Sequence, residues 1–228
     1  SDPTDVRCSL ASASIYQKLG QADQALQILQ KAYETHGESA SVCAEIGLFY
    51  FSQNATAQAL RFLEKASSIE PSNPNYLATL GDIYLKQGRH EQALSKFQKT
   101  LSLRPQNSQA LVGMAECCRE LYRFEEALAY YQRAIQANPR DVKALGSHGS
   151  LCVQLGGLDL GIESLTKAVE LNPNDVDICS GLAKAYQQKG DLATASRYYG
   201  RTVQLNPRDY FASYNLGLIY RSQGHTEK

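Results

Sequence analysis

The sequence contains no tryptophan, a single methionine and no excess of charge of either sign. Lysine plus arginine and aspartate plus glutamate both number 23, so the formal net charge at pH 7 is zero. Proteins that bind nucleic acid or anionic membranes carry a basic excess, and neutrality argues against both partners. No apolar run approaches the roughly 18 residues of a membrane span, and the amino terminus lacks the apolar core of a signal peptide. We therefore expect no nucleic-acid binding and no membrane insertion.

Motifs that carry catalysis or hold a metal are also missing from the sequence. It contains no glycine-rich phosphate loop, no G-x-S-x-G, no H-E-x-x-H and no C-x-x-C pair. We therefore predict no catalytic residue, no metal ion and no cofactor. Most of the six cysteines fall at positions where a core residue is expected, and buried free thiols indicate a reducing compartment. This usage predicts an intracellular, cytoplasmic location.

What the sequence does contain is a 34-residue period. Five prolines stand 34 residues apart, and a residue able to cap a helix follows two positions after each. The side-chain oxygen of such a residue accepts a hydrogen bond from a free N–H group in the first turn, whereas proline ends the preceding helix. The prolines are Pro71, Pro105, Pro139, Pro173 and Pro207, and the expected caps are Asp5, Ser39, Asn73, Asn107, Asp141, Asp175 and Asp209.

The period divides the chain into six complete units and one partial unit, which we expect to form one domain over residues 1–228. Within each unit the apolar spacing is helical and predicts two helices. The eighth position is small and the twenty-fourth is large and apolar, as close packing of two helices requires. The units are 6–39, 40–73, 74–107, 108–141, 142–175, 176–209 and 210–228, and glycine marks the turn between helices at Gly20, Gly88, Gly156, Gly190 and Gly224.

The chain begins without an initiator methionine, and its seventh unit stops at Lys228 before a second helix. A repeat cut open in this way exposes an apolar face. We therefore expect the natural protein to continue beyond this chain.

This pattern resembles the tetratricopeptide repeat (TPR) family in its period, its skeleton of small residue, Tyr, Ala, large residue and Pro, and its helix-turn-helix layout. The resemblance covers essentially the whole chain, although no unit has the family's frequent tryptophan at the fourth position. It implies an all-α fold, an α-solenoid of stacked helix pairs that forms a right-handed superhelix. The first helix of each pair would line a concave groove.

The resemblance also implies that positions two, five, six, nine, twelve and thirteen of each unit face this groove. Position six is mostly small, which leaves room for a ligand backbone. Apolar groove positions cluster in units two to four beside acidic residues, and basic residues follow, so we expect an extended or helical peptide with apolar anchors and a basic segment near the N-terminal half. The predicted partner-binding residues are Glu45, Leu48, Phe51, Thr79, Asp82, Leu85, Glu116, Arg119, Lys143, Lys184, Tyr214 and Asn215.

These observations favour a non-enzymatic scaffold that binds a peptide or partner protein through the groove, within a multi-subunit complex. One alternative is the targeting or regulatory region of an enzyme whose catalytic domain lies outside this chain. Another is self-association through the open ends or the concave surface. Two specialised modes of the family are disfavoured, because the residues that grip chaperone carboxy termini are absent and only Asn215 fits the asparagine ladder of O-linked GlcNAc transferases.

The fifth unit is unusually rich in glycine, with Gly146, Gly149, Gly156, Gly157 and Gly161. Each glycine inside a helix costs about 0.5–1 kcal/mol relative to alanine. Either the unit is a flexible joint, or its glycines allow close packing or access to the groove, and we favour the second interpretation. His148 replaces the usual core residue in this unit, and we expect it to be packed and hydrogen-bonded.

Overall fold

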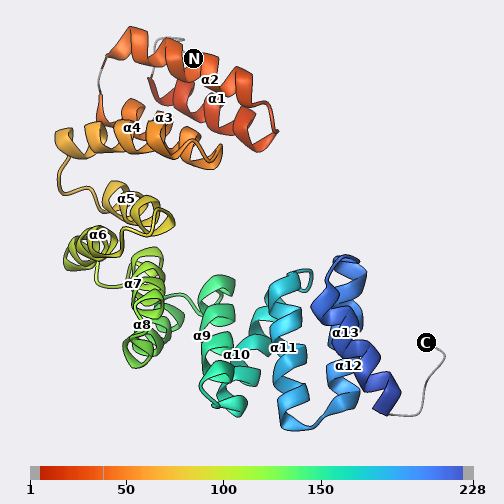
Figure 1. Ribbon diagram of the computed structural model, residues 1–228. Helices are drawn as coiled ribbons and strands as arrows, with labels where there is room; N and C mark the ends of the chain where they lie inside the picture. The colour runs from red at the N-terminus through yellow and green to blue at the C-terminus, as the bar shows by residue number, and fades with distance from the viewer. Residues whose placement is uncertain (1–5, 38, 223–228) are drawn as a thin grey trace. The chain divides into compact units, whose positions relative to one another are not determined.

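The computed structural model describes residues 6–37 and 39–222, which form thirteen α-helices and no strand (Figure 1). Each first helix begins at the residue that opens a predicted repeat. The first helices are α1 (Val6–Lys18), α3 (Ala40–Ser52), α5 (Pro74–Lys86), α7 (Ser108–Glu120), α9 (Val142–Gln154), α11 (Val176–Lys189) and α13 (Tyr210–Ser222). The second helices are α2 (Ala22–His36), α4 (Thr56–Ile69), α6 (His90–Leu103), α8 (Phe124–Ala137), α10 (Leu158–Leu171) and α12 (Leu192–Leu205). The expected all-α solenoid of helix pairs is confirmed.

The chain divides into two compact units, residues 1–117 and 118–228, with the boundary inside α7. In the first unit α1 packs on α2, α3 on α4 and α5 on α6, and each pair stacks on the next. In the second unit α9 packs on α10 and α11 on α12, and α8 and α13 stack at the two ends. We call the 34-residue units of the sequence repeats, and the two compact units the first unit (residues 1–117) and the second unit (residues 118–228). The first-helix face of the first or second unit is the surface formed by its odd-numbered helices.

The predicted caps account for the starts of six first helices, α3, α5, α7, α9, α11 and α13. Each cap side chain accepts a hydrogen bond from a backbone N–H in the first turn, an interaction that contributes about 1 kcal/mol. Among the predicted caps Asp5 lies outside the described residues, as does the predicted turn residue Gly224, and every other predicted cap is confirmed. The acceptor and donor residues are Ser39 and Val42 at 3.3 Å, Asn73 and Asn75 at 3.1 Å, Asn107 and Ala110 at 2.8 Å, Asp141 and Ala144 at 3.0 Å, Asp175 and Ile178 at 3.1 Å, and Asp209 and Ala212 at 2.9 Å.

The turn inside each repeat requires a left-handed backbone at the fifteenth position. Glycine supplies it in four repeats, for example at Gly156 with φ 85°. The second and fourth repeats have no glycine there, yet Asn54 and Tyr122 adopt φ 57° and 58°. Asparagine adopts this region more readily than most residues, but for tyrosine it costs roughly 1–2 kcal/mol, so at Tyr122 the turn geometry overrides the preference of the residue.

The core follows the predicted contact between small and large residues. An added Cβ would lie 2.6 Å from Leu63 Cγ at Gly47 and 2.5 Å from Phe97 Cε1 at Gly81. The large residues at the twenty-fourth position are at most 2% exposed, and so are the alanines four residues before them. Small residues at position eight are therefore a steric requirement of the helix pair.

In the fifth repeat the backbones of the two helices themselves approach closely. An added Cβ at Gly149 would lie 2.7 Å from Leu165 Cγ and 2.9 Å from the carbonyl oxygen of Gly161. An added Cβ at Gly161 would lie 2.5 Å from Val153 Cγ2 and 2.9 Å from the carbonyl oxygen of Gly149. Since each glycine faces the backbone of the other helix, the close-packing interpretation of this repeat is confirmed.

Candidate functional site

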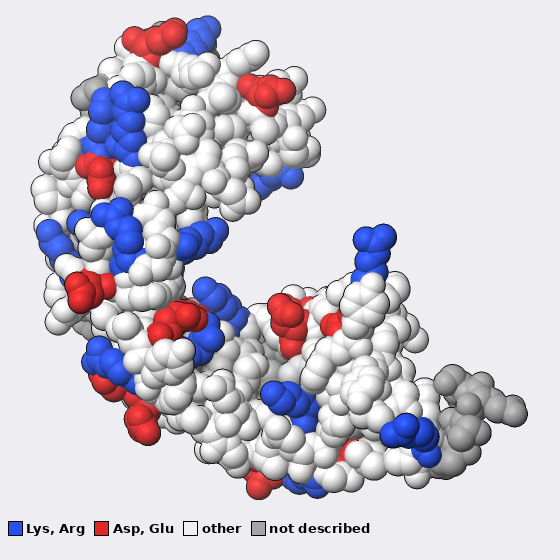
Figure 2. All heavy atoms as spheres, in the orientation of Figure 1, with Lys and Arg blue, Asp and Glu red and all other residues white. Residues whose placement is uncertain are grey.

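Charged side chains do not mark the site by themselves. Figure 2 shows lysine and arginine interspersed with aspartate and glutamate over the face that it presents, with broad uncharged areas between them. This distribution agrees with the zero net charge of the sequence. The site therefore has to be identified from the shape of the surface and from the residues that line it.

On the first-helix face of the first unit, the predicted apolar residues form a shallow surface. Leu48 is 37% exposed, and Leu85 and Phe51 are half-buried. The ammonium of Lys86 lies 4.4 Å from the centre of the Phe51 ring, so a cation already covers that ring. Glu45 is half-buried, and its burial raises the pKa of the carboxyl group above its ordinary value.

The other predicted residues of this unit are mostly occupied by contacts within the protein. Asp82 Oδ2 accepts a hydrogen bond from Gln109 Nε2 at 2.7 Å. The hydroxyl of Thr79 is buried and donates to the carbonyl oxygen of Asn75 at 3.0 Å. Glu116 is only 9% exposed. Asp82 thus links α5 to α7, the Thr79 hydroxyl bonds within α5, and Glu116 presents little surface to a ligand.

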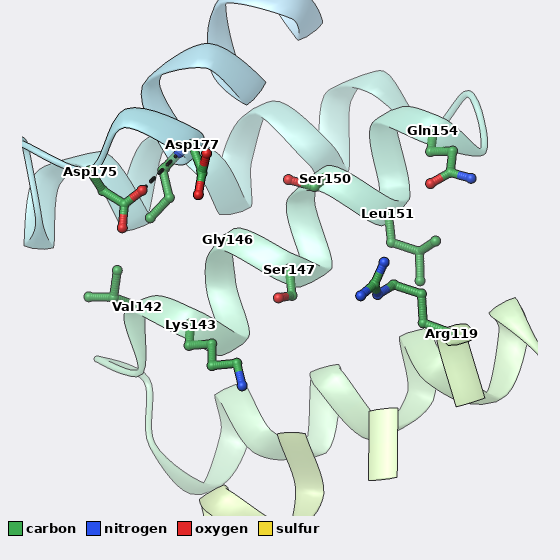
Figure 3. Close-up of a pocket in the computed structure, with 11 residues that line it drawn as sticks. Arg119, Val142, Lys143, Gly146, Ser147, Ser150, Leu151, Gln154, Asp175 and Asp177 are labelled. Carbon is green, nitrogen blue, oxygen red and sulfur yellow. Dashed lines mark hydrogen bonds between the residues drawn. The ribbon is translucent and has the colours of Figure 1, made fainter. Parts of the chain in front are cut away.

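A cavity of about 460 Å³ opens on the first-helix face of the second unit, centred on α9 (Figure 3). We call it the α9 hollow. It exists because positions five, six and nine of the fifth repeat are Gly146, Ser147 and Ser150, whose short side chains leave space that larger residues would fill. The remaining lining residues are Arg119, Val142, Lys143, Leu151, Gln154, Asp175, Asp177 and Ile178.

The α9 hollow is lined by charges of both signs around an apolar floor. Figure 3 shows the guanidinium of Arg119 reaching from the end of α7 toward Leu151, while Asp175 and Asp177 approach from the start of α11. Arg119 also pairs with Glu120 at 2.7 Å, and both side chains are more than 40% exposed. Such a site can bind apolar and charged groups of one ligand together.

Of the twelve predicted partner-binding residues, the structure brings Arg119 and Lys143 together in the α9 hollow. Lys184 is exposed on α11, and Tyr214 is 67% exposed on α13. Asn215 is buried: its Oδ1 accepts from Gln187 Nε2 at 3.2 Å, and its Nδ2 donates to the carbonyl oxygen of Phe211 at 2.8 Å. Asn215 therefore links α13 to α11.

Ser150, Gln154 and Asp177 stand at groove positions of their repeats, but the sequence interpretation named neither them nor Asp175 among the partner-binding residues. Asp175 appeared there only as a helix cap, which it also is. The sequence feature that could have indicated the hollow was the run of small residues at groove positions of the fifth repeat. The sequence interpretation took the glycines of this repeat to allow close packing or access to the groove and did not separate the two roles.

The cysteines behave as small core residues. Every cysteine except Cys8 is buried, and burial raises the pKa of the Cys118, Cys152 and Cys179 thiols, which disfavours the reactive thiolate. His148 is buried as expected, with its Nδ1 2.9 Å from Ser164 Oγ and its Nε2 3.7 Å from Cys152 Sγ. Within residues 6–37 and 39–222, no three metal-ligating side chains gather in one place.

No helix in the described part of the chain is long and apolar enough to cross a membrane.

Comparison with family profiles finds matches along most of the chain. A profile described as subunit 3 of the anaphase-promoting complex, or cyclosome, matches residues 52–134. Three profiles described as tetratricopeptide repeat match residues 16–83, 142–175 and 180–228. No curated protein sequence matches the chain.

Several solved structures share this fold at low sequence identity. The crystal structure of the APC/C hetero-tetramer Cut9-Hcn1 has a TM-score of 0.86 at 16% identity, over 96% of this chain and 43% of that chain. The pilF protein of Pseudomonas aeruginosa has a TM-score of 0.80 at 16% identity, over 98% and 99% of the two chains. YrrB, whose structure is described as having an unusual peptide-binding site, has a TM-score of 0.61 at 22% identity, over 82% and 96%. The chain thus spans less than half the length of the Cut9-Hcn1 relative.

Proposed function

Because this chain belongs to the tetratricopeptide repeat family, we propose that it is a non-enzymatic scaffold that binds an extended segment of a partner protein on its first-helix face. The observation that carries this proposal is the α9 hollow, where groove-facing positions of the fifth repeat leave about 460 Å³ open. A cavity of this size accommodates a few side chains of a bound segment.

Short side chains in the hollow favour a peptide over a compact small molecule. With Gly146, Ser147 and Ser150 along one side of α9, a ligand backbone can approach the helix closely. The serine hydroxyls can donate to and accept from its peptide groups. Leu151 and Ile178 form an apolar floor on which one aliphatic side chain of the segment would pack.

The charges of the hollow favour a segment with both an acidic and a basic side chain. An acidic side chain would lie toward Arg119 and Lys143, and a basic one toward Asp177. The apolar surface around Leu48, Phe51 and Leu85 on the first unit is a second contact region for the same partner in this proposal. Glu45, Asp82 and Glu116 beside it would favour basic residues there.

Assembly into a multi-subunit complex is the context that we propose for this binding. The profile of subunit 3 of the anaphase-promoting complex matches part of the chain, and Cut9-Hcn1 is described as a hetero-tetramer. The buried thiols, with their raised pKa values, support a reducing, cytoplasmic location.

The experiment is partner capture from cell extract with the wild-type chain and two matched variants. Ser150→Trp fills the α9 hollow from an exposed position, and Ser95→Trp adds the same side chain at an exposed position on α6. The proposal expects one partner to bind the wild type and the Ser95→Trp control and to be lost with Ser150→Trp, while circular dichroism shows all three folded.

A third variant locates the contact further. Phe51→Ala with Asp82→Lys changes the first-helix face of the first unit. We expect it to weaken capture less than Ser150→Trp does. A partner that binds Ser150→Trp as strongly as wild type would rule out the α9 hollow as the binding site.

A further inference from the structure

A second cavity, of about 670 Å³, lies along the second helix α12 and shares no residue with the α9 hollow. We call it the α12 cleft. Its polar lining residues are Asn174, Ser196, Arg197, Arg201 and Gln204, and Gly200 lies among them on the helix. Tyrosine rings and the aliphatic side chains of Val169 and Leu205 complete the lining.

The charged side chains that line the cleft, Arg197 and Arg201, are both positive. Arg197 and Arg201 are one helical turn apart and therefore lie on the same face of α12. The equivalent residues of the preceding second helix, Glu163 and Lys167 on α10, form an ion pair at 2.6 Å. In α12 an arginine replaces the glutamate, and no carboxylate of the described residues lines the cleft.

Asp191 is the acidic residue whose carboxyl group the charge of Arg197 affects, and this carboxyl group already has a hydrogen-bond partner. Asp191 caps α12 and accepts a hydrogen bond from the backbone N–H of Thr194 at 3.0 Å. Hydrogen bonds from Thr194, and to a smaller degree the charge of Arg197, lower the pKa of this carboxyl group. Asp191 does not line the cleft, so two positive charges face its interior.

Gly200 is a glycine that helix packing does not require. An added Cβ there would meet no atom within 4 Å, and a glycine inside a helix costs about 0.5–1 kcal/mol relative to alanine. The missing side chain keeps the cleft open beside the two arginines. The equivalent residues of the other second helices are all larger: Gln30, Glu64, Gln98, Gln132 and Thr166.

Neighbouring rings hold one of the arginines in place. The Tyr198 and Tyr186 rings stack in parallel, with centroids 6.1 Å apart and an interplanar angle of 4°. The guanidinium carbon of Arg197 lies 5.1 Å from the centre of the Tyr198 ring. A guanidinium fixed on an aromatic ring loses less entropy when it binds an anion. The amides of Asn174 and Gln204 add hydrogen-bond donors.

We propose that the α12 cleft is a second binding site, for an anionic peptide segment whose carboxylate or phosphate oxygens pair with Arg197 and Arg201. Arginine binds both kinds of oxygen through charge-assisted hydrogen bonds. The tyrosine rings and aliphatic side chains of the lining match the apolar part of a peptide. A nucleic acid would need a longer basic surface than two arginines on a neutral chain provide.

Fluorescence anisotropy with labelled peptides of one length tests this site. The probes are a peptide with six glutamates, the same peptide with glutamines, and a version with two phosphoserines. The wild-type chain is expected to bind the glutamate or the phosphoserine peptide about tenfold more tightly than the glutamine peptide. Raising the salt concentration should weaken that binding. The two anionic probes separate carboxylate from phosphate as the preferred group.

Four variants assign the binding to the cleft. R197E/R201E should weaken it about tenfold, whereas K96E/K99E makes the same charge change on α6 and should leave it unchanged. Gly200→Gln restores the residue type of the other repeats, and it should weaken binding without lowering the unfolding midpoint. Ser150→Trp fills the α9 hollow and should have no effect.

Equal binding of the glutamine peptide and both anionic peptides would overturn the proposal, and so would the absence of binding. Equal losses with K96E/K99E and R197E/R201E would show general charge attraction and no site. If Ser150→Trp abolishes the binding of an anionic peptide, that peptide occupies the α9 hollow and the α12 proposal is wrong. The groove proposal is independent of each result obtained with R197E/R201E.

Discussion

The third and fifth repeats pack their helices by the same contact but fill it differently. In the third repeat the aromatic ring of Phe97 on α6 lies against Gly81 of α5 and also reaches Gly113 of α7. In the fifth repeat Gly149 of α9 faces Leu165 and the backbone of Gly161 on α10. The helix pair of the third repeat therefore packs around a large ring, whereas in the fifth repeat the two helix backbones contact each other directly.

The difference extends to the surface that each repeat presents. On α5 the groove-facing Thr79 is buried, and Asp82 is bonded to Gln109 of the next first helix. On α9 the corresponding positions are Ser147 and Ser150, and the α9 hollow opens there. A repeat can therefore keep the family's packing of small against large residues and still differ in whether its exposed face is closed or open.

The largest expected effect is the loss of the ring in the third repeat. Phe97→Ala removes a side chain with no exposed surface and should lower the free energy of unfolding by about 3–5 kcal/mol. Leu165→Ala in the fifth repeat should cost about 2–5 kcal/mol, and less than Phe97→Ala because α9 and α10 are already close. Urea unfolding followed by circular dichroism measures both. A smaller loss for Phe97→Ala than for Leu165→Ala would show that the ring contributes less to the third repeat than Leu165 does to the fifth.

The backbone approach in the fifth repeat is tested by one substitution at two glycines. Gly161→Ala places a Cβ 2.5 Å from Val153 Cγ2 and should destabilise the protein by about 1–3 kcal/mol. Gly200→Ala meets no atom within 4 Å and should stabilise it by about 0.5–1 kcal/mol. Opposite signs in the same unfolding experiment support the account. Stabilisation by both substitutions would mean that α9 and α10 are not in close contact.

The buried histidine makes the stability of the fifth repeat depend on pH. Burial lowers the pKa of His148 below 6.5, partly opposed by the charge of Glu163. As the pH falls below about 6.5, the unfolded chain therefore binds a proton that the folded chain resists, and stability declines. His148→Gln should flatten this dependence between pH 7.5 and 5.5, as measured by urea midpoints. An unchanged pH profile in the variant would contradict the assignment.

The smallest expected effect concerns the turn of the fourth repeat, which stands between the third and the fifth in the sequence. Gly88 and Gly156 supply the left-handed turn in the third and fifth repeats, but Tyr122 must adopt φ 58° in the fourth. Tyr122→Gly relieves this strain and should raise the unfolding free energy by about 0.5–1 kcal/mol, less the loss of its edge contact with Phe124. Thermal unfolding measures the difference. A lower melting temperature would show that this contact outweighs the strain.

The fold could be predicted from the sequence because each repeat carries the same pattern of helix caps and of small and large core residues. Six caps, from Ser39 to Asp209, were identified by the period alone and are confirmed by hydrogen bonds. The left-handed turns at Asn54 and Tyr122 were not predicted, because glycine was the turn signal; asparagine adopts this conformation more readily than most residues, whereas tyrosine does not. There the neighbouring helices impose the geometry on the residue.

The site was less predictable because it depends on space between repeats. The groove positions implied by the family resemblance include Lys143, Ser150 and Asp177, but the sequence pattern alone did not show that a hollow opens around α9. The α12 cleft was missed because second-helix residues were assigned to the core. Tyr199 does lie there, and burial raises its pKa to about 12, but Arg197 and Arg201 face outward.

The proposed function requires that a partner segment binds on α9. Hydrogen–deuterium exchange of the chain, with and without a saturating partner peptide identified by capture, tests it most directly. The account predicts slower exchange in peptides covering Val142–Gln154 and the start of α11, and no change over α6. Protection confined to α12 or α13, with α9 exchanging as in the free chain, would contradict it.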